Sequence, residues 1–332
     1  MARHPREVLL GAQAGAVALP VCDHYSGVEA RMRKSLALQA QTLRQHGSCL
    51  FDVTLDCEDG APVGGEAEHA ALVNELLAGL GPACGQRVGV RVHPVDHPAF
   101  EADVATIVGT SASRLAYLML PKVESVAEVD RAVAAIDAAG GAALPLHALI
   151  ESPLAVHRAF DIAAHPRIES LSFGLMDFVS AHGGAIPSAG MGVQGQFSHP
   201  LVVQAKLALA SACHAHGKVP SHCVVTEFRD RAALQGAARQ AAQSFGYTRM
   251  WSIHPDQIEV IVEAFAPPAA EIELAAEIVA AAAAVDWAPI SHKGHLHDRA
   301  SVRYFWQVLE RAHRTGCALP SAVAGFLLPA TT

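Results

Sequence analysis

Eight apolar, β-rich runs alternate with helical patterns over the first 265 residues, and this alternation constrains the fold more than any other feature. The predicted strands are residues 16–20, 51–56, 88–93, 115–121, 144–150, 171–176, 219–224 and 250–254. The predicted helices are residues 29–46, 66–80, 99–108, 126–139, 153–164, 200–216, 229–244 and 257–265. Strict alternation indicates right-handed βα units and a parallel sheet. Eight units over roughly 250 residues predict a (β/α)8 TIM barrel. A doubly wound open sheet is the alternative, but no GxGxxG follows the first strand.

The pattern changes after residue 265, where a Pro-Pro pair follows the last helix of the series. An Ala-rich helix is predicted over residues 271–285 and a final helix over residues 298–314, with a polar loop between them. We therefore predict two parts: residues 1–266 form a barrel that carries the active site, and residues 267–332 form a C-terminal helical extension. Extensions of this kind commonly act as a lid or as an oligomer contact.

The composition narrows the possible partners. The formal net charge is −8, the isoelectric point is near 6.1 and no Lys/Arg run is present, so we expect no nucleic-acid surface. Aromatic residues make up 5% of the chain, too few for base-stacking platforms. No apolar run approaches the roughly 20 residues that a membrane span needs. With 51% apolar and 17% charged residues, the chain resembles a soluble α/β enzyme.

The cysteines and the N-terminus indicate a cytoplasmic protein. The seven cysteines are odd in number, scattered and without a CxxC pair, as expected for reduced thiols. Arg3 and Arg6 precede an apolar run, which could be mistaken for an export signal. Gln13 interrupts that run and no clear cleavage site follows it. We therefore assign this segment to the first strand of the barrel.

The stretch over residues 144–177 reads as strand, helix, strand, and each apolar strand ends on a carboxylate. Glu151 follows the first strand and Asp177 follows the second. Adjacent parallel strands lie roughly 4.8 Å apart, so one hard cation could bridge two such side chains. Either acid alone could instead cap the N-terminus of a helix. The matching positions of the two favour a metal site.

The C-terminal ends of barrel strands build the active site of this fold, so the residues at those ends are the site candidates. They are Glu58 and Asp59 after the second strand, Arg91 and His93 at the third, Lys122 after the fourth, Glu151, Asp177, Ser221 and His222 after the seventh, and His254. Strands must end in loops, which accounts for some polar residues there. A ring with four acids and two permanent cations exceeds that expectation.

Oxygen ligands point to magnesium, with manganese as a second choice. Mg²⁺ typically takes one or two protein carboxylates and keeps positions for water and substrate oxygens. Zinc hydrolases of this fold would need an HxH pair at the end of the first strand, which the sequence lacks. Two histidine clusters remain as alternatives, His214/His216 near a helix end and His292, His295 and His297 in the tail loop, and such clusters are mostly solvated surface.

Arg91 and Lys122 each allow two interpretations. Arg91 lies in VRVHP, and a buried arginine needs an anionic partner. That partner is either Glu58 or Asp59 in a structural ion pair, or an oxyanion of the substrate. Lys122 follows MLP, and a lysine at a strand end could form a Schiff base with a carbonyl substrate. Among so many carboxylates, a charged and paired lysine is favoured.

Six ordered motifs resemble the HpcH/HpaI aldolase/citrate lyase family, closest to its citrate lyase β-subunit-like branch with the malyl-CoA and citramalyl-CoA lyases. They are VTLDCEDGA, VRVHP, LPKVES, LIESP, FGLMDF and SIHPDQI. The resemblance covers about residues 50–310. It implies a Mg²⁺-dependent (β/α)8 lyase that assembles as a homotrimer or a homohexamer.

The same resemblance implies roles for individual residues. Glu151 and Asp177 match the metal ligands. Glu58 and Asp59 match acids that hold metal-bound water or the arginine, and Arg91 matches the arginine that binds the oxyanion. Together with Lys122 and His254, Arg91 is assigned to substrate binding.

The tail motif GHLHDRASVRYFWQVLERA also has a family counterpart, in which an aspartate reaches a neighbouring subunit's site as the proton-transfer acid/base. Asp298 matches this residue, although it could instead cap the final helix. Three positions depart from the family pattern: His93 replaces an Asn, Ser221 stands where an Asp is common, and Met250 replaces a Lys.

The chemistry expected of these residues is cleavage of a 3-hydroxy-acyl thioester, such as malyl-, citramalyl- or citryl-CoA, into an acyl-CoA and a 2-keto acid, or the reverse condensation. Mg²⁺ would polarise the hydroxyl and keto oxygens, and Arg91 would stabilise the enolate. Two alternatives remain open. One is thioester hydrolysis in the same site, and the other is a β-subunit-like component that acts only on an acyl-carrier protein.

Overall fold

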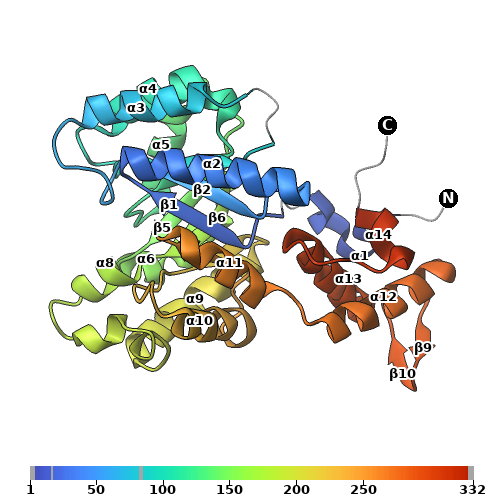
Figure 1. Cartoon of the computed structure of the whole chain (residues 1–332). Coiled ribbons are helices and arrows are strands. Elements are labelled where there is room, and N and C mark those ends of the chain that lie inside the picture. Colours follow the sequence, from blue (N-terminus) through green and yellow to red (C-terminus); the bar gives the residue numbers. More distant parts are fainter. Residues whose placement is uncertain (1–3, 16–17, 82–84, 328–332) are drawn as a thin grey trace. The chain divides into compact units, whose positions relative to one another are not determined.

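A closed parallel barrel forms the centre of the larger unit of the chain. The computed structural model describes residues 4–15, 18–81 and 85–327, and within these ranges β1 to β8 pair in chain order until β8 meets β1 (Figure 1). The strands are β1 Cys22–Ser26, β2 Phe51–Asp56, β3 Val88–Arg91, β4 Tyr117–Leu120, β5 Leu146–Ile150, β6 Ile168–Phe173, β7 Val219–His222 and β8 Arg249–Ser252. The (β/α)8 prediction is confirmed.

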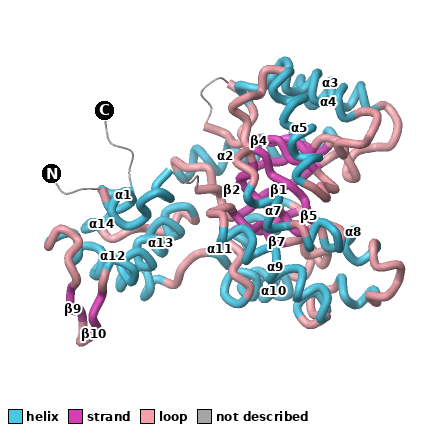
Figure 2. Tube along the Cα trace, turned by 180° about the vertical axis from the view of Figure 1, so that it is seen from behind, coloured by secondary structure: helices cyan, strands magenta, loops and turns pink. Residues whose placement is uncertain are grey.

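Helices follow the strands and cover the outside of the barrel (Figure 2). They are α2 Glu29–His46, α3 Glu66–Ala78, α4 Phe100–Ser111, α5 Val126–Ala138, α6 Pro153–His157, α7 Ala159–Ala164, α8 Leu175–Ser180, α9 Pro200–Ala215, α10 Arg231–Ser244 and α11 Pro255–Phe265. The single helix predicted over residues 153–164 is two helices. They separate at Arg158, whose φ of −97° and ψ of 7° leave the α-helical region.

The prediction of the first strand over residues 16–20 was wrong. Residues 16 and 17 lie outside the described ranges, residues 18–20 are not in a strand, and β1 begins at Cys22. The apolar pattern failed because β1 carries buried polar side chains. Asp23 pairs with the buried Arg249 at 3.0 Å, and Arg249 also pairs with Asp52 at 2.7 Å. Buried charges are tolerated in pairs of this kind, so a strand inside a barrel need not be apolar.

The sixth strand is also displaced from its prediction. It spans Ile168–Phe173 rather than residues 171–176, and Leu175 and Met176 lie in the first turn of α8. Gly174 separates the two elements. The apolar run therefore continues from the end of β6 into the start of α8. Over so short a stretch, the periodicity of apolar residues does not show where the strand ends and the helix begins.

Residues 19–264 form one compact unit, and the described parts of residues 1–18 and 265–332 form another. The second unit contains α1 Pro5–Leu10, η1 Gly11–Gly15, α12 Ala269–Ala284, the antiparallel hairpin β9 Ile290–His292 and β10 His295–His297, α13 Arg299–Arg314, and α14 Ser321–Leu327. The N-terminal segment thus packs with the C-terminal helices, since Leu9 and Leu10 share a core with Trp306 and Leu309.

None of the helices in the described ranges has the length and apolar character that crossing a bilayer requires.

Candidate active site

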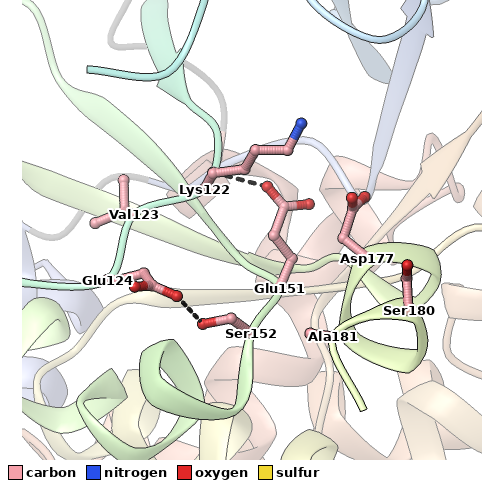
Figure 3. Close-up of a pocket in the computed structure, with 8 residues that line it drawn as sticks. All are labelled: Lys122, Val123, Glu124, Glu151, Ser152, Asp177, Ser180 and Ala181. Carbon is pink, nitrogen blue, oxygen red and sulfur yellow. Dashed lines mark hydrogen bonds between the residues drawn. The ribbon is translucent and has the colours of Figure 1, made fainter. Parts of the chain in front are cut away.

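Two carboxylates, Glu151 and Asp177, point into one cavity of about 350 Å³ (Figure 3). The cavity is lined by Lys122, Val123, Glu124, Glu151, Ser152, Asp177, Ser180 and Ala181. Glu151 directly follows β5, as predicted. Asp177 does not end a strand. It is the third residue of α8, four positions beyond the end of β6. Both acids therefore still reach the C-terminal end of the barrel, from a strand end and from the helix after the next strand.

Three backbone features hold the Glu151 side chain in place. The N–H of Lys122 donates to Glu151 Oε1 at 2.7 Å. Lys122 adopts a φ of 53°, the left-handed region that side chains other than glycine seldom occupy. On the opposite side, a Cβ atom at Gly174 would lie 2.4 Å from Glu151 Oε2, so only glycine leaves room for the carboxylate. Unusual backbone of this kind is concentrated at functional sites.

The environment of Glu151 favours a bound cation. Burial, and then the negative charge of Asp177, raises the pKa of Glu151 to about 7. Among the described residues, neither Glu151 Oε2 nor the Asp177 carboxylate has a hydrogen-bond partner or an ion pair. Free carboxylate oxygens that repel one another across a cavity are what a divalent ion neutralises. The donor set, two carboxylates with open space around them, fits Mg²⁺ or Mn²⁺.

Arg91 lies at the end of β3 in a cluster of fixed partners. Its Nε and Nη2 donate to the two oxygens of Asp56 at 2.6 and 2.8 Å, and its Nη1 is 3.0 Å from Glu58 Oε2. Nη2 also donates to the Tyr25 hydroxyl at 3.2 Å. Burial opposes the charge, but the attraction of Asp56 outweighs it and the pKa of Arg91 lies above its ordinary value. The guanidinium is therefore charged and rigidly oriented.

Asp56 and Tyr25 were not predicted from the sequence. Asp56 accepts the backbone N–H groups of Glu58 and Gly60 at 3.0 and 2.7 Å in addition to the guanidinium. A Cβ atom at Gly60 would lie 2.4 Å from Asp56 Oδ2. The DCEDG stretch thus wraps around the carboxylate of Asp56. An aspartate that ends a strand and is followed by Glu and Gly is the sequence signal that could have identified this residue.

The two acids predicted after β2, Glu58 and Asp59, differ in which cations they contact. Glu58 bridges Arg91 and Lys122, whose Nζ donates to Glu58 Oε1. Asp59 contacts Lys122 Nζ at 3.3 Å and makes no ion pair with Arg91. Burial lowers the pKa of Lys122, but Glu58 raises it by more, so the amine stays protonated. A protonated lysine does not attack a carbonyl, which argues against a Schiff base.

Lys122 is the other residue predicted at the strand ends that lines the cavity of Glu151 and Asp177. The remaining predicted residues are not among its lining residues, and these are Glu58, Asp59, Arg91, His93, Ser221, His222 and His254. His254 Nδ1 accepts the N–H of Asp256 at the start of α11, and its ring stacks on Phe228 at 5.0 Å. His222 stacks on Phe197. His93 is held by Asp103 of α4, with Nδ1 and Oδ2 2.6 Å apart.

Asp298 belongs to the second unit of the chain. It is the N-cap of α13, and its carboxylate accepts the N–H of Ser301 at 2.9 Å. In the same unit, His292 contacts Glu277 and His297 contacts Ser301. Across the described residues, no group of three or more His, Cys, Asp or Glu side chains is arranged to hold a metal ion.

Comparison with known proteins bears out the resemblance of the motifs. Residues 37–255 match the family model described as HpcH/HpaI aldolase/citrate lyase. An L-malyl-CoA/β-methylmalyl-CoA lyase of Cereibacter sphaeroides is 30% identical over 281 residues, covering 78% of this chain and 86% of that protein.

Two solved structures are also similar. A citrate lyase from Burkholderia xenovorans LB400 is 50% identical, with a TM-score of 0.81 and coverage of 98% of this chain and 100% of that one. Protein CitE from Mycobacterium tuberculosis, solved with magnesium, acetoacetate and coenzyme A, shares the fold at 23% identity. Its TM-score is 0.67, with coverage of 89% and 98%.

Proposed function

This chain belongs to the HpcH/HpaI aldolase/citrate lyase family, and we propose that it is a Mg²⁺-dependent carbon–carbon lyase. Its substrate would be a 3-hydroxy-acyl thioester of the malyl-, citramalyl- or citryl-CoA type, cleaved to an acyl-CoA and a 2-keto acid. The observation that carries this proposal is a pair of carboxylates that share one cavity, the buried Glu151 and the partly buried Asp177. The charged groups of Arg91 and Lys122 lie near them.

Glu151 and Asp177 would hold the ion, which supplies a Lewis acid for the hydroxyl and keto oxygens of the substrate. Lys122 orients Glu151 through its backbone N–H and places a second positive charge near the cavity through Nζ. Because Lys122 Nζ is already paired with Glu58, its side chain holds the acids in position more than it binds substrate.

Arg91 would stabilise the enolate oxygen that develops on the thioester when the carbon–carbon bond breaks. A guanidinium fixed by Asp56 and Glu58 needs no reorientation as that charge forms, and preorganised charges of this kind are worth roughly 3–4 kcal/mol. Nη1 is the nitrogen available to the oxyanion, since Nε and Nη2 donate to Asp56 and Tyr25 whereas Nη1 makes an ion pair with Glu58 but no hydrogen bond within the described residues.

The enolate carbon needs a proton, and Asp298 is our candidate donor. In the isolated chain its carboxylate caps α13, leaving one oxygen free for a second interaction. We further propose that the active form is a homotrimer or homohexamer in which Asp298 serves a neighbouring subunit. A cytoplasmic location would suit the free thiols of the six described cysteines.

The test is to incubate the purified chain with malyl-, citramalyl- and citryl-CoA in the presence of Mg²⁺. The lyase releases acetyl-CoA together with glyoxylate, pyruvate or oxaloacetate, and chelation with EDTA stops it. Activity on free CoA esters would exclude a component that works only with an acyl-carrier protein. Release of free thiol from every ester without any keto acid would contradict the lyase.

A further inference from the structure

Tyr25 is an uncharged hydrogen-bond partner of Arg91. It is the fourth residue of β1, and its hydroxyl accepts a hydrogen bond from Arg91 Nη2 at 3.2 Å. The same nitrogen donates to Asp56 Oδ2 at 2.8 Å, and Nε donates to Asp56 Oδ1 at 2.6 Å. Burial, and then the negative charge of Asp56, raises the pKa of the Tyr25 phenol, so its hydroxyl stays neutral.

The contacts with Asp56 and Tyr25 use three of the five N–H groups of the guanidinium. Nε carries one N–H and each Nη carries two, so Nε and Nη2 are fully used. The two N–H groups of Nη1 remain. Nη1 is 3.0 Å from Glu58 Oε2 in an ion pair, without a hydrogen bond within the described residues. Without the Tyr25 hydroxyl, Nη2 would also have an unused N–H.

The side chain of Tyr25 is held in this orientation by its neighbours. Its ring stacks on Trp251 of β8, with 5.5 Å between the ring centroids and 22° between the planes. Trp251 Nε1 in turn donates to Ser172 Oγ of β6 at 3.1 Å. Arg91 Cζ lies 4.9 Å from the centroid of the Tyr25 ring, which adds a cation–π attraction. A Cβ atom at Gly60 would lie 2.4 Å from the Tyr25 hydroxyl, so the loop after β2 closes against this hydroxyl because residue 60 is glycine.

We propose that Tyr25 is a positioning residue, which directs the oxyanion of the substrate to Nη1 of Arg91. An oxyanion binds where a charged N–H is unused, and Nη2 without its hydroxyl partner would be a second such place. A carbonyl oxygen bound at Nη2 would lie away from the nitrogen that is prepared for the enolate. The Tyr25 hydroxyl thus removes an unproductive binding mode without touching the substrate. This role rests on the proposed function, because the oxyanion is that of the proposed lyase substrate.

Tyr25→Phe removes the hydroxyl and keeps the ring. In the lyase assay with Mg²⁺, kcat should fall about tenfold, which corresponds to about 1.4 kcal/mol and is typical of a hydrogen bond to a charged group. KM should stay level or fall, because the freed N–H of Nη2 adds binding in the ground state. A residue that only stabilised the fold would not produce this division between kcat and KM.

Tyr117→Phe is the matched control. The Tyr117 hydroxyl is also buried in the barrel, but it lies at the start of β4 and contacts Thr54 Oγ1 at 2.6 Å and Asp23 Oδ1 at 3.1 Å. This variant should melt earlier and keep kcat within about twofold, since its lost contacts do not involve Arg91. In the Arg91→Lys background, Tyr25→Phe should also change kcat by less than about twofold, because two residues that act through one contact are not additive.

Two results would overturn the proposal. One is an unchanged kcat in Tyr25→Phe. The other is an equal fall of kcat with and without Arg91, which would mean that Tyr25 acts independently of the guanidinium.

Failure of the lyase proposal is a separate outcome, because the wild type would then release no keto acid from malyl-, citramalyl- or citryl-CoA. The role of Tyr25 is in that case decided by NMR of protein whose arginines carry nitrogen-15, with the Arg91 signals identified by their loss in Arg91→Lys. Rotation that exchanges Nη1 and Nη2 should be about tenfold faster in Tyr25→Phe, since one hydrogen bond that opposes it is gone. An unchanged exchange rate would overturn the positioning role.

Discussion

Glu151 lies so close to Gly174 that the two residues cannot both carry a side chain in this arrangement. A Cβ atom on residue 174 would be 2.4 Å from Oε2 and 2.5 Å from Cβ of Glu151. Real Cβ contacts are much longer, so one side would have to move. The glycine between β6 and α8 therefore decides where a carboxylate from β5 can point.

Gly174→Ala should displace the Glu151 carboxylate and weaken Mg²⁺ binding at least tenfold. The fold should survive with a loss of about 1–3 kcal/mol, typical of local overpacking. Titration calorimetry and thermal unfolding measure the two effects. Gly236→Ala in α10 is the control, because a Cβ there meets nothing within 4 Å. It should stabilise the helix by about 0.5–1 kcal/mol and leave Mg²⁺ binding unchanged. Normal affinity in the Gly174 variant would show that this contact does not control the site.

Glu151→Gln and Asp177→Asn should each abolish most of the Mg²⁺ affinity while the fold is retained. Burial and Asp177 raise the pKa of Glu151 to about 7, so above that pH the metal-free protein holds an unfavourable charge. At pH 8, Glu151→Gln should therefore make the metal-free protein more stable, by roughly 1–2 kcal/mol. Ser180→Ala, which changes a neutral residue of the same cavity, is the control. Unchanged Mg²⁺ binding in both acid variants would show that Glu151 and Asp177 are not the metal ligands.

Helix α5 is an element that sequence reasoning placed correctly from an ordinary amphipathic pattern. The predicted span, residues 126–139, is one residue longer than Val126–Ala138, and the buried residues of this helix, Val129, Ala132 and Ile136, are all apolar. The first strand was missed because Asp23 is buried against Arg249, a partner more than two hundred residues away. No local pattern signals a charge that is compensated at such a distance.

In the candidate site, too, the local sequence did not reveal which residues contact one another in the fold. Strand-end position alone was enough to select Glu151 and Arg91. It could not assign the partner of Arg91, which is Asp56 with Glu58 rather than Asp59, because that choice depends on how the loop after β2 folds back on itself. It also could not show that Tyr25 stacks on Trp251 beside the guanidinium, at 5.5 Å between ring centroids.

Arg91→Lys should lower kcat/KM by roughly a hundredfold, about 3 kcal/mol, because a lysine cannot keep the planar fork between Asp56 and an oxyanion. The same change breaks a bidentate ion pair, so the free energy of unfolding should also fall. Arg249→Lys separates the two effects. Arg249 is equally buried between two carboxylates, but it begins β8 at the opposite end of the strands. Steady-state kinetics on folded protein should show a large loss of kcat/KM only for Arg91→Lys. Equal losses of kcat/KM in both variants would indicate that Arg91 has a structural role rather than a catalytic one.

Lys206 makes stability depend on pH in the alkaline range. It lies fully buried on α9, its Nζ donates to Gln196 Oε1 at 2.9 Å, and burial lowers its pKa to about 8. The unfolded chain titrates near 10.4, so between pH 8 and 10 the unfolded state binds more protons and the free energy of unfolding rises with pH. Below pH 8 the buried charge destabilises the fold in full.

Lys206→Met removes that charge. Denaturant unfolding at pH 7 to 10 should show the variant's stability relative to wild type falling by about 2–3 kcal/mol across this range. Differences between variants cancel the titration of every other group. Lys34→Met, at an exposed position of α2, should give a difference that does not change with pH. A constant difference for Lys206→Met as well would mean that its pKa is not lowered.

Asp298 provides the last prediction, that proton transfer requires two subunits. Its carboxylate caps α13 in a unit of the chain separate from the barrel, at the end of a hairpin whose turn residues Lys293 and Gly294 both have positive φ. Replacing an N-cap residue with Ala typically costs about 1 kcal/mol, so Asp298→Ala should lower the melting temperature slightly. Asp298→Ser should restore the N-cap hydrogen bond without restoring the acid. Both should lose turnover if the acid is catalytic, whereas recovery in Asp298→Ser would make capping its only role.

Subunit mixing then locates the acid. Asp298→Ser and Glu151→Gln chains, each inactive alone, are unfolded and refolded together, and mass spectrometry of differently tagged chains verifies the exchange. If Asp298 acts across an interface, some mixed sites combine an intact metal pair with an intact tail, and part of the activity returns. If each chain uses its own Asp298, every site keeps one defect and the mixture stays inactive. A monomeric active enzyme would contradict the prediction without any mixing, because no neighbouring subunit could then supply the proton.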